Sequence, residues 1–150
     1  MAEFLRLHRE LNKKEALCLC EQAMIQAGLA DTKRILNSRP YQLSGGMLQR
    51  VLIALAIAGK ARLVIADEPT TALDAIHRDR AVEQLLKLRE QGCAILIVTH
   101  DFDVARHMGG HVLIMKEGRM VERGSAKEVL QNPKAGYTKE LIEAIHLGWG

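Results

Sequence analysis

The sequence predicts an α/β protein with parallel strands. Two short apolar runs, residues 63–66 and 94–99, flank an amphipathic stretch over residues 78–91 that ends at Gly92. Strand, helix and strand in this order and at this spacing indicate a crossover unit with parallel strands. Aromatic residues make up only 3% of the chain, so the core is expected to consist of aliphatic side chains. The absence of apolar–polar alternation further predicts strands buried on both faces.

We expect residues 1–58 to form a helical subdomain and residues 59–150 an α/β lobe with C-terminal helices. Asn12 and Glu15 form a capping-box pattern, which predicts the start of a helix that stops before Gly28. Residues 47–58 are apolar on most sides, which predicts a helix buried nearly all round.

Capping and turn signals define the remaining elements. Asp31 is expected to cap a short helix. Residues 111–115 and 119–122 are typical of a hairpin. Ser125 with Glu128 is a second capping-box pattern, so the tail is predicted to form two short helices broken near Pro133.

Composition excludes several classes of protein. The net charge of the 150 residues is +3, and basic and acidic residues are interleaved, which argues against a nucleic-acid-binding stripe. The longest apolar run, residues 51–58, is far shorter than the roughly 20 residues that cross a bilayer, so any membrane role is expected to be peripheral. Cys18, Cys20 and Cys93 form no C-x-x-C pair, so reduced thiols are expected rather than disulfides or a zinc site.

Two adjacent carboxylates, Asp67 and Glu68, follow the first apolar run. Open α/β sheets place their ligands at the carboxyl ends of the strands. One carboxylate there can hold Mg²⁺ through water while the other orients a water molecule that attacks a γ-phosphate. The structural alternative is a solvated acidic turn, which Pro69 favours in any case.

Two further patterns suit a phosphate ligand. Ser44, Gly45 and Gly46 directly precede the apolar helix, where backbone N–H groups can bind an anion, although a simple capped turn gives the same pattern. His100 closes the second apolar run and is expected at the same sheet edge as Glu68, where it can bond a phosphate oxygen or the attacking water. A lone histidine at a strand end is otherwise usually structural.

Four segments in order resemble the motifs of ABC-type ATPases. Residues 43–50 (LSGGMLQR) resemble the ABC signature and residues 63–68 (LVIADE) the Walker B strand, while residues 71–74 (TALD) and 99–101 (THD) resemble the D-loop and the switch histidine. The resemblance covers essentially the whole chain. It implies a partial P-loop NTPase (RecA-like) lobe preceded by a helical signature subdomain, with the N-terminal Walker A part absent.

The resemblance also implies roles for individual residues. Asp67 would bind Mg²⁺, Glu68 would polarise the attacking water, and His100 would sense the γ-phosphate. Asp74 would tie one subunit to the other across a dimer. Each ATP would lie between two subunits, where the signature residues face the nucleotide held by the partner; the positions assigned to nucleotide binding are Ser44, Gly45, Gly46, Gln49 and Asp74.

Within the family, the variant signature with Met47 and the tail segment 136–141 resemble the oligopeptide, dipeptide and nickel import branch. The implied partners are a second ATPase subunit and membrane-embedded permease subunits that contact the helical lobe. The implied location is the cytoplasmic face of the inner membrane. The cargo and the choice between homo- and heterodimer stay open.

The phosphate-binding loop G-x-x-x-x-G-K-[ST] does not occur in these residues. The one Gly-Lys pair, Gly59-Lys60, is followed by Ala61, and Ala54 stands where the first glycine should be. The Walker A strand and the Q-loop would lie upstream of Met1. We therefore expect the 150 residues alone neither to bind ATP tightly nor to hydrolyse it at a useful rate.

Two other interpretations stay open. An ABC-type ATPase of DNA repair or chromosome maintenance would share the signature, Walker B and switch motifs, but would be expected to carry zinc modules or long coiled coils, and neither occurs here. A truncated, non-catalytic remnant would also lack the phosphate loop, although intact Glu68 and His100 argue against long-standing decay.

Overall fold

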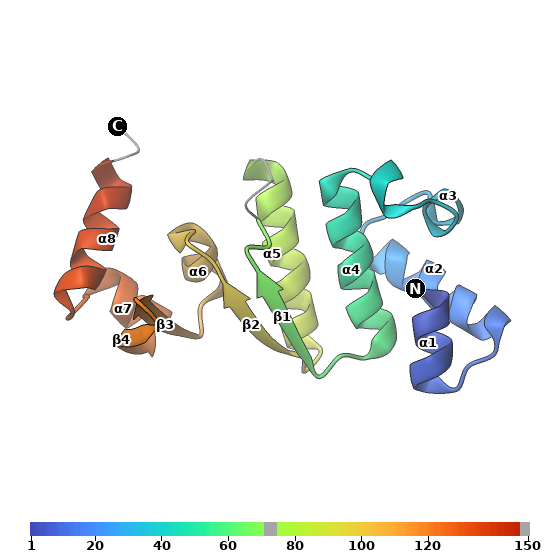
Figure 1. Ribbon diagram of the computed structural model, residues 1–150, viewed down its shortest axis with the longest axis horizontal. Helices are drawn as coiled ribbons and strands as arrows, with labels where there is room; N and C mark the ends of the chain where they lie inside the picture. The colour runs from blue at the N-terminus through green and yellow to red at the C-terminus, as the bar shows by residue number, and fades with distance from the viewer. Residues whose placement is uncertain (71–74, 148–150) are drawn as a thin grey trace. The chain divides into compact units, whose positions relative to one another are not determined.

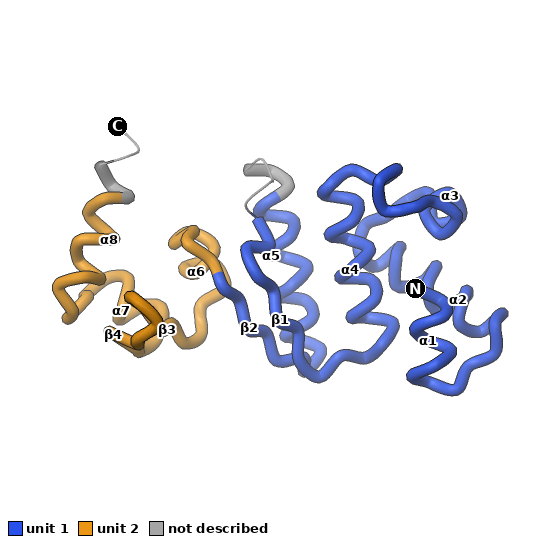
Figure 2. The backbone as a smooth tube through the Cα atoms, in the orientation of Figure 1, with its two compact units in different colours: residues 1–98 blue, residues 99–150 orange. Residues whose placement is uncertain are grey.

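The computed structural model describes residues 1–70 and 75–147, with the backbone alone described for residues 75–77 and 145–147. The chain divides into two compact units, residues 1–98 and residues 99–150, which are drawn in different colours in Figure 2. This boundary lies forty residues beyond the division at residue 58 that the motifs predict. The predicted division follows the positions of the motifs rather than the packing of the chain, and it stays a prediction.

Five helices and a two-stranded sheet are described in the first unit (Figure 1). The helix α1 was not predicted from the sequence, whereas the other helices and both strands were. The elements are α1 (Ala2–Arg9), α2 (Lys13–Gln26), α3 (Thr32–Leu36), a 3₁₀ turn η1 (Pro40–Gln42), α4 (Gly45–Gly59), β1 (Leu63–Asp67), α5 (Ala75–Glu90) and β2 (Ala94–Val98).

The core of the helical part lies where α1, α2 and α4 pack together. Leu5, Cys20 and Met24 are almost completely buried there. The Arg9 Nη1 donates a hydrogen bond to the Ala58 carbonyl at 2.9 Å, which satisfies one of the free carbonyls at the end of α4. The long helix α4 is therefore held by packing along its length and by a side chain at its end.

The predicted capping box at the start of α2 is confirmed. The Asn12 side chain accepts from the Glu15 N–H at 3.0 Å, and the Glu15 carboxylate accepts from the Asn12 N–H at 2.9 Å. Two donors that helix geometry leaves without partners are thereby satisfied.

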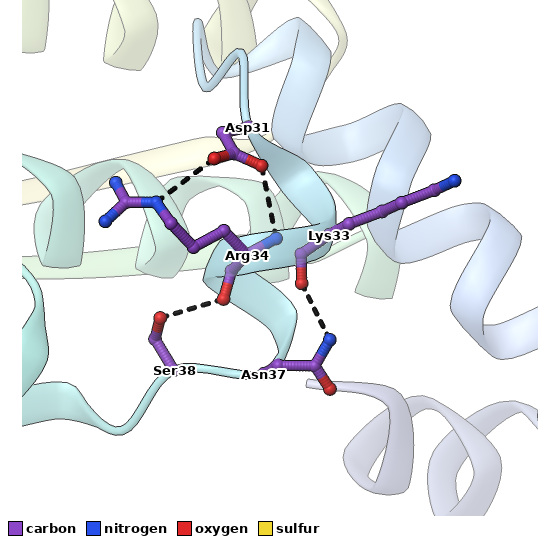
Figure 3. A network of polar contacts seen from close by, with 5 residues as sticks. All are labelled: Asp31, Lys33, Arg34, Asn37 and Ser38. Atoms are coloured by element: carbon purple, nitrogen blue, oxygen red, sulfur yellow. Dashed lines mark hydrogen bonds and ion pairs between the residues drawn. The ribbon is translucent and has the colours of Figure 1, made fainter.

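The short helix α3 is held by a local polar network (Figure 3). The predicted cap is present: the Asp31 carboxylate accepts from the Arg34 N–H at 3.2 Å and pairs with the Arg34 Nε at 3.1 Å. At the other end of α3, the Ser38 hydroxyl donates to the Arg34 carbonyl at 2.8 Å and the Asn37 amide donates to the Lys33 carbonyl at 2.9 Å. The start and the end of α3 are therefore both held by side-chain hydrogen bonds, and the chain continues from there to the glycine pair at the start of α4.

The strands β1 and β2 are parallel neighbours, as predicted. Their register pairs Leu63 with Ala94 at one end and Asp67 with Val98 at the other. The helix α5 connects them and contacts β2, and its buried side chains are aliphatic. The crossover unit places the carboxyl ends of both strands at the same edge of the sheet.

The prediction that both strands are buried on both faces is wrong for this unit. Alternate side chains along each strand are exposed, with exposed fractions of 54% for Leu63, 65% for Ile65, 47% for Leu96 and 52% for Val98. The reason is that α5 covers one face, and within the described part of this unit no second layer covers the other. The helix α4 departs from the prediction in the same way, because Leu52 is 60% exposed.

The second unit contains α6 (Phe102–Met108), β3 (His111–Lys116), β4 (Arg119–Ser125), α7 (Ala126–Gln131) and α8 (Gly136–Leu147). The predicted hairpin and the break between two C-terminal helices are both confirmed. The capping box of α7 is present, with Ser125 and Glu128 bonded reciprocally. Across the described residues, no helix is both long enough and apolar enough to cross a membrane.

A carboxylate from β4 caps the start of α8. The Glu122 side chain accepts from the backbone N–H of Lys134 at 2.8 Å and of Ala135 at 3.1 Å. The Thr138 hydroxyl beside it and these two N–H groups hold the pKa of Glu122 below its ordinary value. The Thr138 hydroxyl is fully buried and has no hydrogen-bond partner among the described residues. The hydrogen bonds that hold the Glu122 carboxylate are therefore the two from the backbone N–H groups.

We predict that the stability of the second unit falls in acid because of Glu122. A carboxyl group whose pKa is lower in the folded state stabilises that state above its unfolded pKa, about 4.3. The contribution is lost as the pH falls through the folded pKa. Urea unfolding between pH 6 and pH 3 should therefore be less pH-dependent in Glu122→Gln than in the wild type.

The control is Glu143→Gln, which removes an exposed carboxylate from α8, the helix that Glu122 caps. It should keep the wild-type pH dependence. Equal pH dependence in wild type and Glu122→Gln would show that this cap does not contribute.

Candidate functional site

The acidic pair lies at the carboxyl end of β1. Asp67 is the last residue of the strand and is exposed, and Glu68 is half-buried. The Glu68 backbone has φ 47°, in the left-handed region that residues other than glycine seldom adopt. Its N–H donates to the Val98 carbonyl at 2.8 Å, at the end of β2. The two neighbouring carboxylates thus lie at the start of a tight turn that is hydrogen-bonded to the adjacent strand β2.

The glycine pair lies at the N-terminus of α4. Ser44 is the N-cap, and its hydroxyl oxygen accepts from the Met47 N–H at 3.3 Å. A Cβ atom added to Gly45 would meet no atom within 4 Å, so the space above that backbone is open. The first N–H groups of a helix have no intrahelical partner. The helix tip is therefore both a capped turn and a backbone surface that an anion can approach.

One side chain joins these two features. The Gln49 Nε2, in the second turn of α4, donates to the Pro69 carbonyl at 2.6 Å. Pro69 directly follows Glu68, so the hydrogen bond connects the helix that begins at Ser44 with the turn that carries the carboxylates. Gln49 and Pro69, twenty residues apart in sequence, are therefore adjacent in the first unit.

The remaining predicted residues are not placed relative to this pair. His100 belongs to the second unit and is exposed, so its proximity to Glu68 stays a prediction. The next residue, Asp101, caps α6 by accepting from the N–H groups of Asp103 at 2.9 Å and Val104 at 3.2 Å. Asp74 and the rest of the segment 71–74 lie outside the described residues.

The side chains fit Mg²⁺ bound together with a phosphate ligand, rather than a cage made by the protein alone. Among the side chains that the structure describes, those of residues 1–70 and 78–144, no three from His, Cys, Asp or Glu gather to hold a metal ion. Mg²⁺ usually keeps several waters and takes one or two carboxylates plus the phosphates of its substrate. A single exposed carboxylate such as Asp67 suits that arrangement.

Three features of the site were not predicted from the sequence. The Pro69 and Val98 carbonyls serve as acceptors, but backbone groups give no residue-type signal. The hydrogen bond of the Gln49 amide to the chain was not predicted, and the assignment of Gln49 to nucleotide binding stays a prediction. The left-handed backbone at Glu68 had no clear signal, because a following proline disfavours the right-handed helical region but directs the residue before it toward extended conformations.

Comparison with known proteins places these motifs in one family. A family model described as ABC transporter matches residues 3–71. The metal-staphylopine import system ATP-binding protein CntD of Staphylococcus aureus is 41% identical over 143 residues, which cover 95% of this chain and 53% of that protein. The oligopeptide transport ATP-binding protein OppD of Lactococcus lactis subsp. cremoris is 41% identical over 124 residues, 82% of this chain and 37% of that protein. The chain therefore spans about half or less of the length of these relatives.

Solved structures agree with the fold. The cbiO1 protein of Clostridium perfringens, described as part of an ABC transporter complex, matches with a TM-score of 0.72 at 29% identity, over 97% of this chain and 55% of that one. The cassette MJ0796, described as dimeric, matches with a TM-score of 0.66 at 33% identity, over 77% of this chain and 49% of that one.

We predict that the left-handed backbone at Glu68 costs stability. Glu68→Gly and Glu68→Ala both remove the carboxylate and its contacts, but only glycine adopts a positive φ without steric cost. The glycine variant should therefore be more stable than the alanine variant by about 1 kcal/mol. Urea unfolding of the two variants measures the difference, and an alanine variant at least as stable as the glycine variant would show that the strain is absent.

Proposed function

The chain belongs to the ABC transporter family, and we propose that it is the C-terminal part of an ATP-hydrolysing subunit that energises import of peptides or nickel. The observation that carries the proposal is the 2.6 Å hydrogen bond from Gln49 to Pro69, because it brings the signature helix and the acidic pair together. The importer relatives, at 41% identity, support the transport class over DNA repair.

We assign distinct roles to the two carboxylates. Asp67, exposed at the end of β1, would hold Mg²⁺ through water, and the ion would supply charge neutralisation on the phosphates. Glu68, half-buried and fixed by its N–H bond to Val98, would orient the attacking water and accept its proton. Different burial of two neighbouring carboxylates allows one to bind a cation and the other to act as a base.

The proposed nucleotide is shared between two subunits. Ser44, Gly45 and Gly46 would present the N-terminus of α4 to the γ-phosphate of ATP held by the partner subunit. His100 would bond the γ-phosphate within its own subunit, and Asp74 would contact the partner. The dimeric cassette among the solved relatives supports this arrangement.

The proposal includes partners on both sides of the subunit. The helical part formed by residues 1–58 would contact membrane-embedded permease subunits at the cytoplasmic face of the membrane. The bare face of the β1–β2 sheet would be covered by the part of the ATPase that carries the Walker A loop, since an uncovered aliphatic surface of this kind is unfavourable in water. ATP binding would depend on that part, because the 150 residues contain no phosphate-binding loop.

We predict that supplying the phosphate loop restores hydrolysis. The N-terminal half of the Staphylococcus aureus relative, joined in frame before Met1, should give Mg²⁺-dependent phosphate release from ATP, whereas the 150 residues alone should release none. Glu68→Gln in the chimera should lower turnover by a factor of about a hundred or more while preserving ATP-bound dimers, because it removes the base and keeps the shape.

Cooperative thermal unfolding of the chimera, monitored by circular dichroism, establishes that it is folded. A folded chimera without ATPase activity would overturn the proposal. Unchanged turnover in Glu68→Gln would remove Glu68 from its assigned role and leave the family membership intact.

A further inference from the structure

The geometry around Pro69 points to Gln49 as a positioning residue for Glu68. We infer that the Gln49 side-chain amide, by holding the Pro69 carbonyl, keeps the turn after β1 in the conformation that presents the Glu68 carboxylate. The consequence for hydrolysis rests on the proposed function, whereas the structural link does not.

The turn at residues 67–70 is held on both sides of Glu68. On its N-terminal side, the Glu68 N–H donates to the Val98 carbonyl at 2.8 Å. On the C-terminal side of Glu68, the Pro69 carbonyl accepts from the Gln49 Nε2 at 2.6 Å. The next residue, Thr70, is buried, with 5% of its surface exposed. Of these three restraints, only the hydrogen bond from Gln49 is made by a side chain that reaches the turn from a helix, α4.

The conformation between these restraints needs outside support. Glu68 has φ 47°, and a left-handed backbone at a residue other than glycine persists only where the surroundings over-determine it. Pro69 disfavours the right-handed helical alternative for Glu68 and favours extended conformations. A turn that relaxed to an extended conformation would redirect both the Pro69 carbonyl and the Glu68 side chain. The Gln49 hydrogen bond opposes that relaxation because it fixes the Pro69 carbonyl.

Gln49 lies away from the capped tip of α4 at which the nucleotide is proposed to bind. It lies five residues after the N-cap Ser44, which is about 7.5 Å along the helix axis and about 140° around it. Its amide is half-buried and already donates within the chain. Under the proposed function, Gln49 would connect the helix whose tip faces one ATP with the turn whose carboxylate serves the other.

Amide hydrogen exchange, measured by NMR on the 150-residue chain, tests the inference without nucleotide. The informative amide is that of Glu68, which reports on the turn. The reference amide is that of Ala94, which donates to the Arg62 carbonyl at 2.9 Å at the opposite end of the same strand pair. In Gln49→Met, which keeps the length of the side chain and removes the donor, exchange at Glu68 should accelerate about tenfold while exchange at Ala94 stays unchanged.

Two further variants make the test specific. Gln49→Glu keeps the side-chain shape and replaces the donor by an acceptor at neutral pH, so it should accelerate exchange at Glu68 at least as much. Gln84→Met is the matched control, because Gln84 is a half-buried glutamine that lines the same cavity as Gln49, of about 270 Å³, from the side of α5. It should change exchange at neither amide.

Two results would overturn the inference. An unchanged exchange rate at the Glu68 amide in both Gln49 variants would mean that the turn keeps its conformation without the Gln49 hydrogen bond. Equal acceleration at Glu68 and Ala94 would mean that Gln49 stabilises the fold in general. The exchange measurement needs no ATP. A chimera that fails to hydrolyse ATP would therefore count against the proposed function alone, and a selective effect on exchange at Glu68 would still support the inference about Gln49.

Discussion

The parallel pairing of β1 with β2 is the constraint on which the rest of the site depends. Its register ends with Asp67 opposite Val98, and the next N–H, that of Glu68, is bonded to the Val98 carbonyl. The ladder therefore continues one residue past the strand and fixes where the carboxylates leave the sheet. The segment 99–101 follows the same end of β2 directly, so the strand pairing also determines where the chain carrying His100 departs.

The features predicted from the sequence were those that local interactions determine. The capping boxes at Asn12 and Ser125 were predictable because a cap is formed by residues three positions apart. The parallel crossover was predictable because helix and strand lengths limit the topologies. The helix α1 was missed: it spans only eight residues, and its N-cap Met1 makes no side-chain capping hydrogen bond, so the usual start signal is lacking.

The features that were not predicted depend on groups distant in sequence. Burial of both faces of β1 was inferred from its continuous apolar run, but burial needs a second covering layer, and Ile65 is 65% exposed. The hydrogen bond from Gln49 to Pro69 joins a side chain to a backbone carbonyl, and the sequence contains no sign of that acceptor. Residue types thus predicted which segments carry the chemistry, whereas the fold determined which atoms hold those segments together.

The central claim is that the tip of α4, the acidic pair and His100 act on triphosphates shared between two subunits. A crystal structure of the ATP-bound chimera carrying Glu68→Gln tests it most directly. The account predicts a dimer in which residue 68 and His100 of one subunit lie within hydrogen-bonding distance of one γ-phosphate, and Ser44 of the other subunit faces the same phosphate. His100 on the opposite side of the sheet from residue 68 would contradict it.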